Sequence, residues 1–140
     1  MRKLLSLAML LVLVFTTSCK SDEKKNEPAP IEEVVTVIET ISTSELEKLG
    51  NDIQLVDVRT PEEFEQGYIK NAINLNVKSD EFLEQTILID KSKPVYVYCM
   101  AGVRSTKAAE KLKDAGFTKV YNYTEGYGTW LDQGKQISMD

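Results

Sequence analysis

Cys99 stands between a run of β-forming residues and a short loop, Cys99 to Arg104, that leads into a helix-like segment. The carboxyl end of a parallel strand is where α/β folds bind their ligands. Gly102 allows the sharp turn that this loop needs, and the backbone N–H groups of the loop and of the next helical turn then converge on the sulfur. Arg104 adds a fixed positive charge. We therefore expect Cys99 to ionise at neutral pH and to act as a nucleophile without a general base.

The composition excludes several other kinds of active site. The 140 residues include no histidine and two cysteines. A Ser-His-Asp triad, a Cys-His dyad, an HExxH metalloprotease site and a histidine-bearing zinc site all need histidine. Two cysteines cannot form a four-thiolate metal site, so no metal is expected. The paired carboxylates Glu32-Glu33 and Glu62-Glu63 fall on a charged tether and on the first turn of a helix, which favours solvation and capping over glycosidase chemistry.

Short apolar runs alternate with helical patterns along the chain, which predicts one domain built on a mostly parallel sheet. Strands are expected over 54–58, 94–98 and 120–123. Ser42 and Thr60 are each followed three residues later by glutamate, as in a capping box, and are expected to begin helices. Further helices are expected over 79–86, with Ser79 as the N-cap, over 105–115 and over 127–133. Trp130 is expected to anchor the last helix, and four alternating tyrosines should pack on the sheet: Tyr96, Tyr98, Tyr121 and Tyr123.

Four segments of the chain resemble a single-domain rhodanese, a sulfurtransferase, and occur in the order typical of that family. They are residues 55–64 (LVDVRTPEEF), residues 67–75 (GYIKNAINL), the loop 99–105 (CMAGVRS), and Gly126 with Trp130. The resemblance as a whole extends over nearly all of residues 34–135. The resemblance implies an α/β fold, a five-stranded parallel sheet with helices on both faces, without a cofactor.

The resemblance also implies a mechanism and a set of site residues. Cys99 would attack a small sulfane-sulfur donor and hold the sulfur as a persulfide, which a thiol or a cyanide-like acceptor then removes. Asp57 and Arg59 match the family's strand end beside this loop and would support it. Arg104 would also offer its charge to an anionic donor. The backbone N–H groups that would bind the persulfide belong to Met100, Ala101, Gly102, Val103 and Arg104.

The chain departs from the family pattern around the pocket. Tyr68 and Lys70-Asn71 replace the histidine and the proline-glycine pair of many members, and Glu125-Gly126 replaces a glycine pair. These changes concern packing and the rim of the pocket more than the nucleophile. Members that use thiosulfate well often carry extra basic loop residues, whereas this loop has Arg104 beside apolar neighbours. The natural sulfur donor is therefore left open.

Two other functions are compatible with a loop of this kind. Dual-specificity phosphatases share the fold, but their loop is Cys-x5-Arg, whereas Cys99 to Arg104 is Cys-x4-Arg. The shorter loop suits a single sulfur atom better than a phosphate group. Rhodanese-like domains also occur as non-catalytic binding or thiol-redox modules. The presence of Cys99, Gly102 and Arg104 in one loop favours the enzyme over this alternative.

The first residues predict export and lipid attachment. A basic start is followed by an almost unbroken apolar run of twelve residues, 4–15, which is too short to span a bilayer but is typical of a signal peptide. Small residues then lead to Cys19, which resembles the lipobox of bacterial lipoproteins. We expect a signal peptide over 1–18, lipidation of Cys19, a disordered tether over 19–33 and the folded domain over 34–140. This places the protein in the bacterial cell envelope, on the periplasmic face or the outer surface.

The charge of the chain limits its partners. The net charge is −5, and it becomes −7 once residues 1–18 are removed, because two basic residues and no acidic ones lie there. Such a chain is not expected to bind nucleic acid or to dock on anionic lipid through its surface. The lipid at Cys19 would hold it at the membrane. A monomer is expected, because the predicted core uses every apolar stripe.

Overall fold

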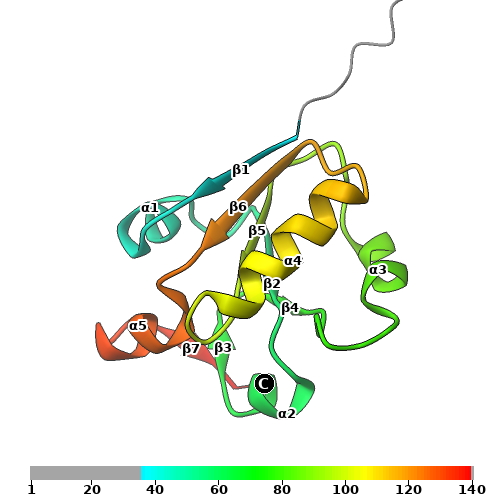
Figure 1. Cartoon of the computed structure of the whole chain (residues 1–140). Coiled ribbons are helices and arrows are strands. Elements are labelled where there is room, and N and C mark those ends of the chain that lie inside the picture. Colours follow the sequence, from blue (N-terminus) through cyan, green and yellow to red (C-terminus); the bar gives the residue numbers. More distant parts are fainter. Residues whose placement is uncertain (1–35, 140) are drawn as a thin grey trace, which may run out of the picture. The chain divides into compact units, whose positions relative to one another are not determined.

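A computed structural model of the protein describes residues 36–139, so the predicted signal peptide, Cys19 and the whole of the predicted tether lie outside the described residues (Figure 1). Five strands form one parallel sheet in the order β1-β6-β5-β2-β4. Their bounds are β1 Val37–Thr40, β2 Gln54–Asp57, β4 Ile73–Asn74, β5 Val95–Tyr98 and β6 Lys119–Tyr123. This confirms the expected five-stranded parallel sheet.

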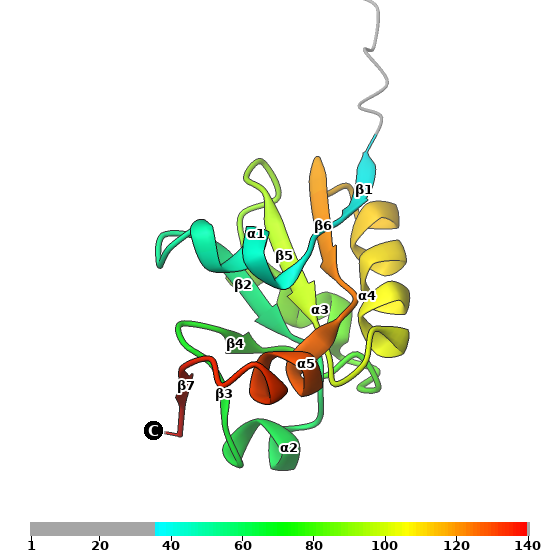
Figure 2. The same cartoon turned by 90° about the vertical axis from the view of Figure 1, so that its left-hand side faces the viewer.

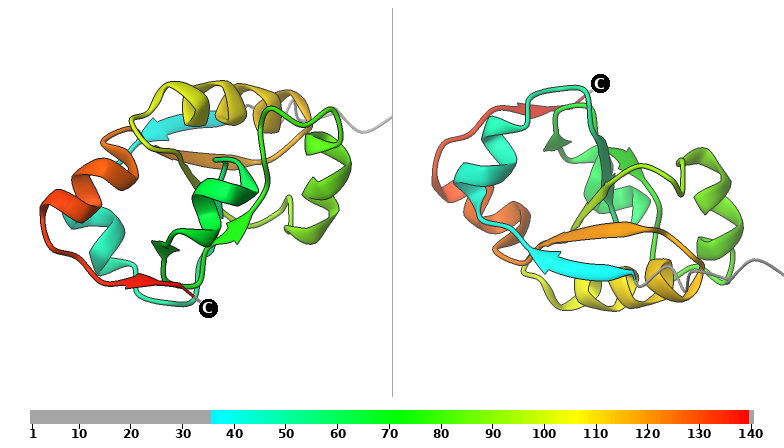
Figure 3. Two further views of the ribbon diagram at one scale, coloured as in Figure 1. Left: turned by 90° about the horizontal axis from the view of Figure 1, so that it is seen from below. Right: turned by 90° about the horizontal axis from the view of Figure 1, so that it is seen from above.

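Helices cover both faces of the sheet (Figures 2 and 3). Helices α1 (Thr43–Lys48) and α5 (Gly126–Asp132) pack on one face, and α4 (Val103–Asp114) and α3 (Phe82–Gln85), which continues into the 3₁₀ turn η1 (Thr86–Leu88), pack on the other. Helix α2 (Pro61–Glu65) follows β2. Two short strands, β3 (Tyr68–Ile69) and β7 (Ile137–Ser138), pair in antiparallel fashion outside the main sheet.

Each face of the sheet has its own buried core, because parallel strands that are covered on both sides bury both sets of side chains. Under α4, the small residues Ala108 and Ala109 and the side chain of Leu112 pack on strand valines and on Phe82. The other core is aromatic, and Trp130 packs edge-on against Tyr123 with ring centroids 6.3 Å apart. The four alternating tyrosines belong to this second core or pack against it, which confirms their predicted role in the sheet.

Most predicted helices are present, with two corrections at their starts. Ser42 and Thr60 both form complete capping boxes, as expected. The helix predicted over 79–86 begins instead at Phe82, because Ser79 is used in a turn: its hydroxyl accepts the N–H of Glu81 and its carbonyl accepts the N–H of Phe82. The helix predicted from residue 105 begins two residues earlier, at Val103, directly after Gly102.

One surface feature contradicts an assumption made from the sequence. Leu83, Ile87 and Leu88 are exposed on α3 and η1, with Ile87 87% exposed, so the core does not use every apolar side chain. The basis for expecting a monomer was therefore wrong, and the monomer itself stays a prediction. No helix among residues 36–139 is long and apolar enough to cross a membrane.

Candidate active site

Cys99 lies directly after β5, at the carboxyl end of the sheet, and is 1% exposed. The chain turns sharply at Gly102, whose φ of 87° is in the left-handed region that favours glycine. This turn brings the N–H of Gly102 to 3.1 Å from Cys99 Sγ, and the hydroxyl of Ser105 lies 3.7 Å from the same sulfur. The sequence therefore folds into the loop that was expected around the sulfur.

The surroundings of Cys99 favour its ionised form. Burial raises the pKa of the Cys99 thiol, but hydrogen bonds from the backbone N–H groups of Ser105, Ala101 and Arg104 and from the Ser105 hydroxyl outweigh it. The net effect is a pKa below the ordinary value of a cysteine. A thiolate at neutral pH needs no general base to act as a nucleophile.

Helix α5 holds the loop from its other side. The N–H of Tyr127 donates to the Cys99 carbonyl at 2.8 Å, and the N–H of Gly128 donates to the Met100 carbonyl at 3.0 Å. The start of α5 approaches so closely that a Cβ atom on Gly126 would lie 2.5 Å from the Met100 oxygen. The loop carbonyls therefore face α5, and this leaves its N–H groups directed at the sulfur. Sequence reasoning did not find this contact.

Arg104 is paired with Glu63 of α2. Two hydrogen bonds, Nη1 to Oε2 at 2.5 Å and Nη2 to Oε1 at 2.8 Å, join the guanidinium to the carboxylate. Arg104 and the Thr60 N–H of the capping box hold the pKa of Glu63 down, to about 2. Sequence analysis assigned Glu63 to capping alone and left Arg104 unpaired. The structure confirms the capping and adds the ion pair. The Glu63 carboxylate thus neutralises the positive charge of Arg104, which was expected to attract an anionic sulfur donor.

Asp57 and Arg59 form a buried ion pair, with Arg59 Nη2 2.6 Å from Asp57 Oδ2. The Arg59 guanidinium also donates to the Gly67 carbonyl at 2.8 Å and lies 4.0 Å from the centroid of the Tyr127 ring. The backbone N–H of Tyr127 donates to the Cys99 carbonyl, so the Asp57–Arg59 pair is connected to the loop through Tyr127. Its position fits the supporting role predicted for both residues.

The surface around the buried sulfur is apolar. Met100 is 37% exposed and Val103 is 70% exposed, and Ala101 between them is exposed as well. No group of three or more histidine, cysteine or acidic side chains among residues 36–139 could hold a metal ion. What the loop offers is a thiolate surrounded by backbone N–H groups and an apolar rim.

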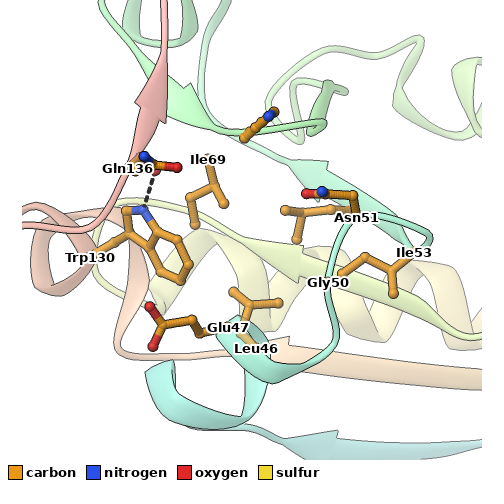
Figure 4. Close-up of a pocket in the computed structure, with 10 residues that line it drawn as sticks. Leu46, Glu47, Gly50, Asn51, Ile53, Ile69, Trp130 and Gln136 are labelled. Atoms are coloured by element: carbon orange, nitrogen blue, oxygen red, sulfur yellow. Dashed lines mark hydrogen bonds between the residues drawn. The ribbon is translucent and has the colours of Figure 1, made fainter.

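A pocket of about 260 Å³ opens elsewhere, between α1, β3 and α5 (Figure 4). Trp130 lines it together with Leu46 and Ile69, and its indole N–H donates to the Gln136 carbonyl at 2.9 Å. Trp130 is 7% exposed and packs α5 onto the aromatic core, as predicted. None of the residues that line this pocket belongs to the Cys99 loop.

Comparisons with known proteins agree with this geometry. Residues 42–133 match the family model of the rhodanese-like domain. The chain is 37% identical over 94 residues to the uncharacterized protein YqhL of Bacillus subtilis, which covers 67% of this chain and 73% of that protein. It is 40% identical over 80 residues to the thiosulfate sulfurtransferase GlpE of Coxiella burnetii, covering 56% of this chain and 72% of that protein.

Solved structures resemble the fold as well. A rhodanese-like domain protein from Staphylococcus aureus superposes with a TM-score of 0.61 at 36% identity, over 71% of this chain and 98% of that one. The fold, the loop around Cys99 and the family model thus agree. The chain belongs to the family of proteins with a rhodanese-like domain.

Proposed function

We propose that the protein is a sulfurtransferase that carries sulfane sulfur as a persulfide on Cys99. The observation that carries this proposal is the 3.1 Å contact from the Gly102 N–H to Cys99 Sγ, in a loop whose N–H groups lower the pKa of the thiol. A loop that stabilises one sulfur anion can also stabilise the terminal sulfur of a persulfide, which is an anion of the same kind. The relative GlpE, named a thiosulfate sulfurtransferase, supports the same reaction class.

The reaction would proceed in two transfers. The Cys99 thiolate attacks the outer sulfur of a donor, the sulfur–sulfur bond of the donor breaks, and the rest of the donor leaves with the bonding electrons. Cys99 then holds the sulfur as a persulfide. A thiolate or cyanide attacks the terminal sulfur, and Cys99 leaves as the thiolate that began the cycle. The loop N–H groups stabilise the negative charge on sulfur throughout.

The test is the intact mass of the reduced protein after exposure to thiosulfate or polysulfide, beside a Cys99→Ser variant. The proposal expects a gain of one sulfur atom that cyanide removes and that the variant lacks. No gain with either donor, in a folded protein with a free thiol, would contradict it. That outcome would leave a non-catalytic binding or thiol-redox module as the better account.

Phosphatase activity is the second function considered for this loop, and the structure gives it less support than sulfur transfer. Phosphate carries two negative charges near neutral pH, and the one basic residue of the Cys99–Arg104 loop is already paired with Glu63. A phosphatase assay on the same preparation would check this, and we expect no turnover.

We also propose that the protein is exported and lipidated at Cys19, which would hold the domain at the bacterial envelope. This proposal rests on the apolar run over 4–15 and the small residues before Cys19. Expression of the full chain in bacteria with a labelled fatty acid tests it. We expect label on the wild type and none on Cys19→Ala, and label on both variants or on neither would contradict the assignment.

A further inference from the structure

The pairing of Arg104 bears on the class of sulfur donor that the site accepts. Arg104 is the one basic residue in the loop from Cys99 to Arg104, and both ends of its guanidinium are bound to the Glu63 carboxylate. Because this carboxylate stays ionised throughout the neutral range, the pair carries no net charge. An anionic donor therefore gains little attraction from the loop cation.

The charges and the surface around the Glu63–Arg104 pair also disfavour a strongly anionic donor. Helix α2, which supplies Glu63, has two further glutamates, Glu62 and Glu65, and no basic residue. The Cys99 thiolate, with which Arg104 also interacts, adds another negative charge, and the chain as a whole carries −5. Repulsion from these charges grows with the negative charge of the donor. The exposed Met100 and Val103 instead offer apolar contact to a donor with an apolar body.

We infer that the site takes sulfane-sulfur donors with an apolar body and at most one negative charge, and that Glu63 disfavours thiosulfate by pairing with Arg104. The inference rests on the proposed persulfide chemistry at Cys99. An organic thiosulfonate, R–SO₂–S⁻, is a donor of this class. The Cys99 thiolate attacks its outer sulfur, the S–S bond breaks, and the sulfinate R–SO₂⁻ leaves with the bonding electron pair. Cys99–S–S⁻ forms without an external oxidant or a proton. Thiosulfate reacts in the same way and releases sulfite, but it carries two charges.

The experiment compares two donors that differ in charge and body but share this chemistry, benzenethiosulfonate and thiosulfate. For each, the second-order rate constant for loading one sulfur on Cys99 is measured by quenching and intact mass. The variants are Glu63→Gln, which frees Arg104, and Glu62→Gln, which removes a charge from the same helical turn without touching the pair. Glutamine at position 63 can still complete the capping box. A change in Cys99 reactivity or in folding affects both donors, so the ratio of the two rate constants isolates the charge.

The wild type is expected to load faster from benzenethiosulfonate. Glu63→Gln is expected to raise the thiosulfate rate relative to the benzenethiosulfonate rate by about 10-fold, the effect of one nearby unit charge that is partly screened. Glu62→Gln should change this ratio by less than about 3-fold, because the Glu62 charge is exposed and the Arg104 pair is made by Glu63. Added salt should raise the wild-type thiosulfate rate more than the benzenethiosulfonate rate.

The two proposals fail in different ways. If Cys99 gains sulfur from both donors but the ratio is the same in the wild type and Glu63→Gln, the inference about Glu63 is wrong and the sulfurtransferase proposal stands. A wild-type preference for thiosulfate would overturn the inference as well. If neither donor loads sulfur on Cys99, the sulfurtransferase proposal itself fails.

Discussion

The backbone N–H of Tyr127 donates to the carbonyl of Cys99 at 2.8 Å, which ties the first turn of α5 to the end of β5. The first N–H groups of a helix have no partner within the helix and are commonly bound by a capping side chain. In α5 no side chain caps the helix, and the carbonyls of Cys99 and Met100 accept two of these N–H groups instead. The carbonyls of the active-site loop and the first N–H groups of α5 are thus hydrogen-bond partners of each other.

Gly126→Ala is expected to disrupt this junction. Gly126 has φ 74°, and the added Cβ would lie 2.5 Å from the Met100 oxygen. We expect the free energy of unfolding to fall by about 2–4 kcal/mol, from backbone strain and overpacking together. Urea unfolding followed by the fluorescence of Trp130, the one tryptophan of the chain, measures this loss.

Gly134→Ala is the matched control for Gly126→Ala. Gly134 also has a positive φ, of 65°, but nothing lies within 4 Å of the site of its Cβ. It should lose only the strain energy, about 1–2 kcal/mol. Equal losses in the two variants would show that the close approach to Met100 contributes nothing.

Ser105→Ala is expected to raise the pKa of Cys99. The Ser105 hydroxyl is one of the groups that hold the thiol pKa below its ordinary value, and alanine removes it while keeping the backbone N–H. Thiolate absorbance near 240 nm, taken as the difference from Cys99→Ser, follows the ionisation of Cys99 alone. The midpoint should move to higher pH in Ser105→Ala and stay unchanged in Ser92→Ala, an exposed serine whose hydroxyl binds Asp90 and not Cys99. A shift in both variants would contradict the local cause.

Arg59→Met is expected to destabilise the fold strongly. It leaves the Asp57 carboxylate buried without its partner, at 0% side-chain exposure. Breaking a buried pair in this way costs about 3–5 kcal/mol of unfolding free energy. Lys93→Met is the control, because its pair with Asp90 is exposed and should contribute at most about 1 kcal/mol. Similar losses from the two substitutions, measured by urea unfolding, would argue against the buried pair as a support of the loop.

The Glu63–Arg104 pair predicts a stability difference that depends on pH. The folded protein holds the pKa of Glu63 at about 2, below the pKa of 4.5 that an unperturbed glutamate has in the unfolded chain. A lowered folded pKa stabilises the native state above pH 4.5, and this stabilisation is lost as the pH falls towards 2. The unfolding free energy of the wild type should therefore exceed that of Glu63→Gln most at neutral pH, and the gap should close between pH 4.5 and 2.

Urea unfolding at several pH values between 2 and 7 measures that gap. Glu62→Gln keeps the ion pair, so its own gap to the wild type should change less over the same range. A gap for Glu63→Gln that does not depend on pH would mean that the ion pair adds no stability.

Local signals in the sequence were sufficient for much of the fold. A capping box is read from residues three apart, so Ser42 with Glu45 and Thr60 with Glu63 predicted two helix starts correctly. Ser79 carries a similar local signal but forms a turn, because its hydroxyl and its carbonyl accept the N–H groups of Glu81 and Phe82 before the helix begins. Strand β1 was not predicted although Val37, Ile38 and Thr40 are β-branched, and β4 was not predicted because it has two residues.

From the residue types alone, the site was predictable only where its parts are close in the sequence, and the place of Asp57 and Arg59 beside the loop came from the family resemblance. Cys99, Gly102 and Arg104 share one loop, and the turn that brings N–H groups to the sulfur follows from a glycine at that spacing. The partner of Arg104 could not be found in this way, since Glu63 lies 41 positions away and both residues have other plausible uses. The hydrogen bond from Tyr127 to Cys99 joins two backbone atoms, so the types of the two residues do not predict it.

The bonds from α5 to the Cys99 loop also affect when the site can form during synthesis. Residues emerge from the ribosome from the N-terminus, so Cys99 is free of the ribosome before Tyr127 and Gly128 are available to bind the loop carbonyls. The loop can be completed only when nearly all of the described domain has been made. A chain that ends before α5 would carry the thiol and the N–H groups that lower its pKa, but not the two N–H groups that hold the loop carbonyls in place. The Cys99 loop is therefore held from both sides only after the last helix of the described domain has been translated and has folded.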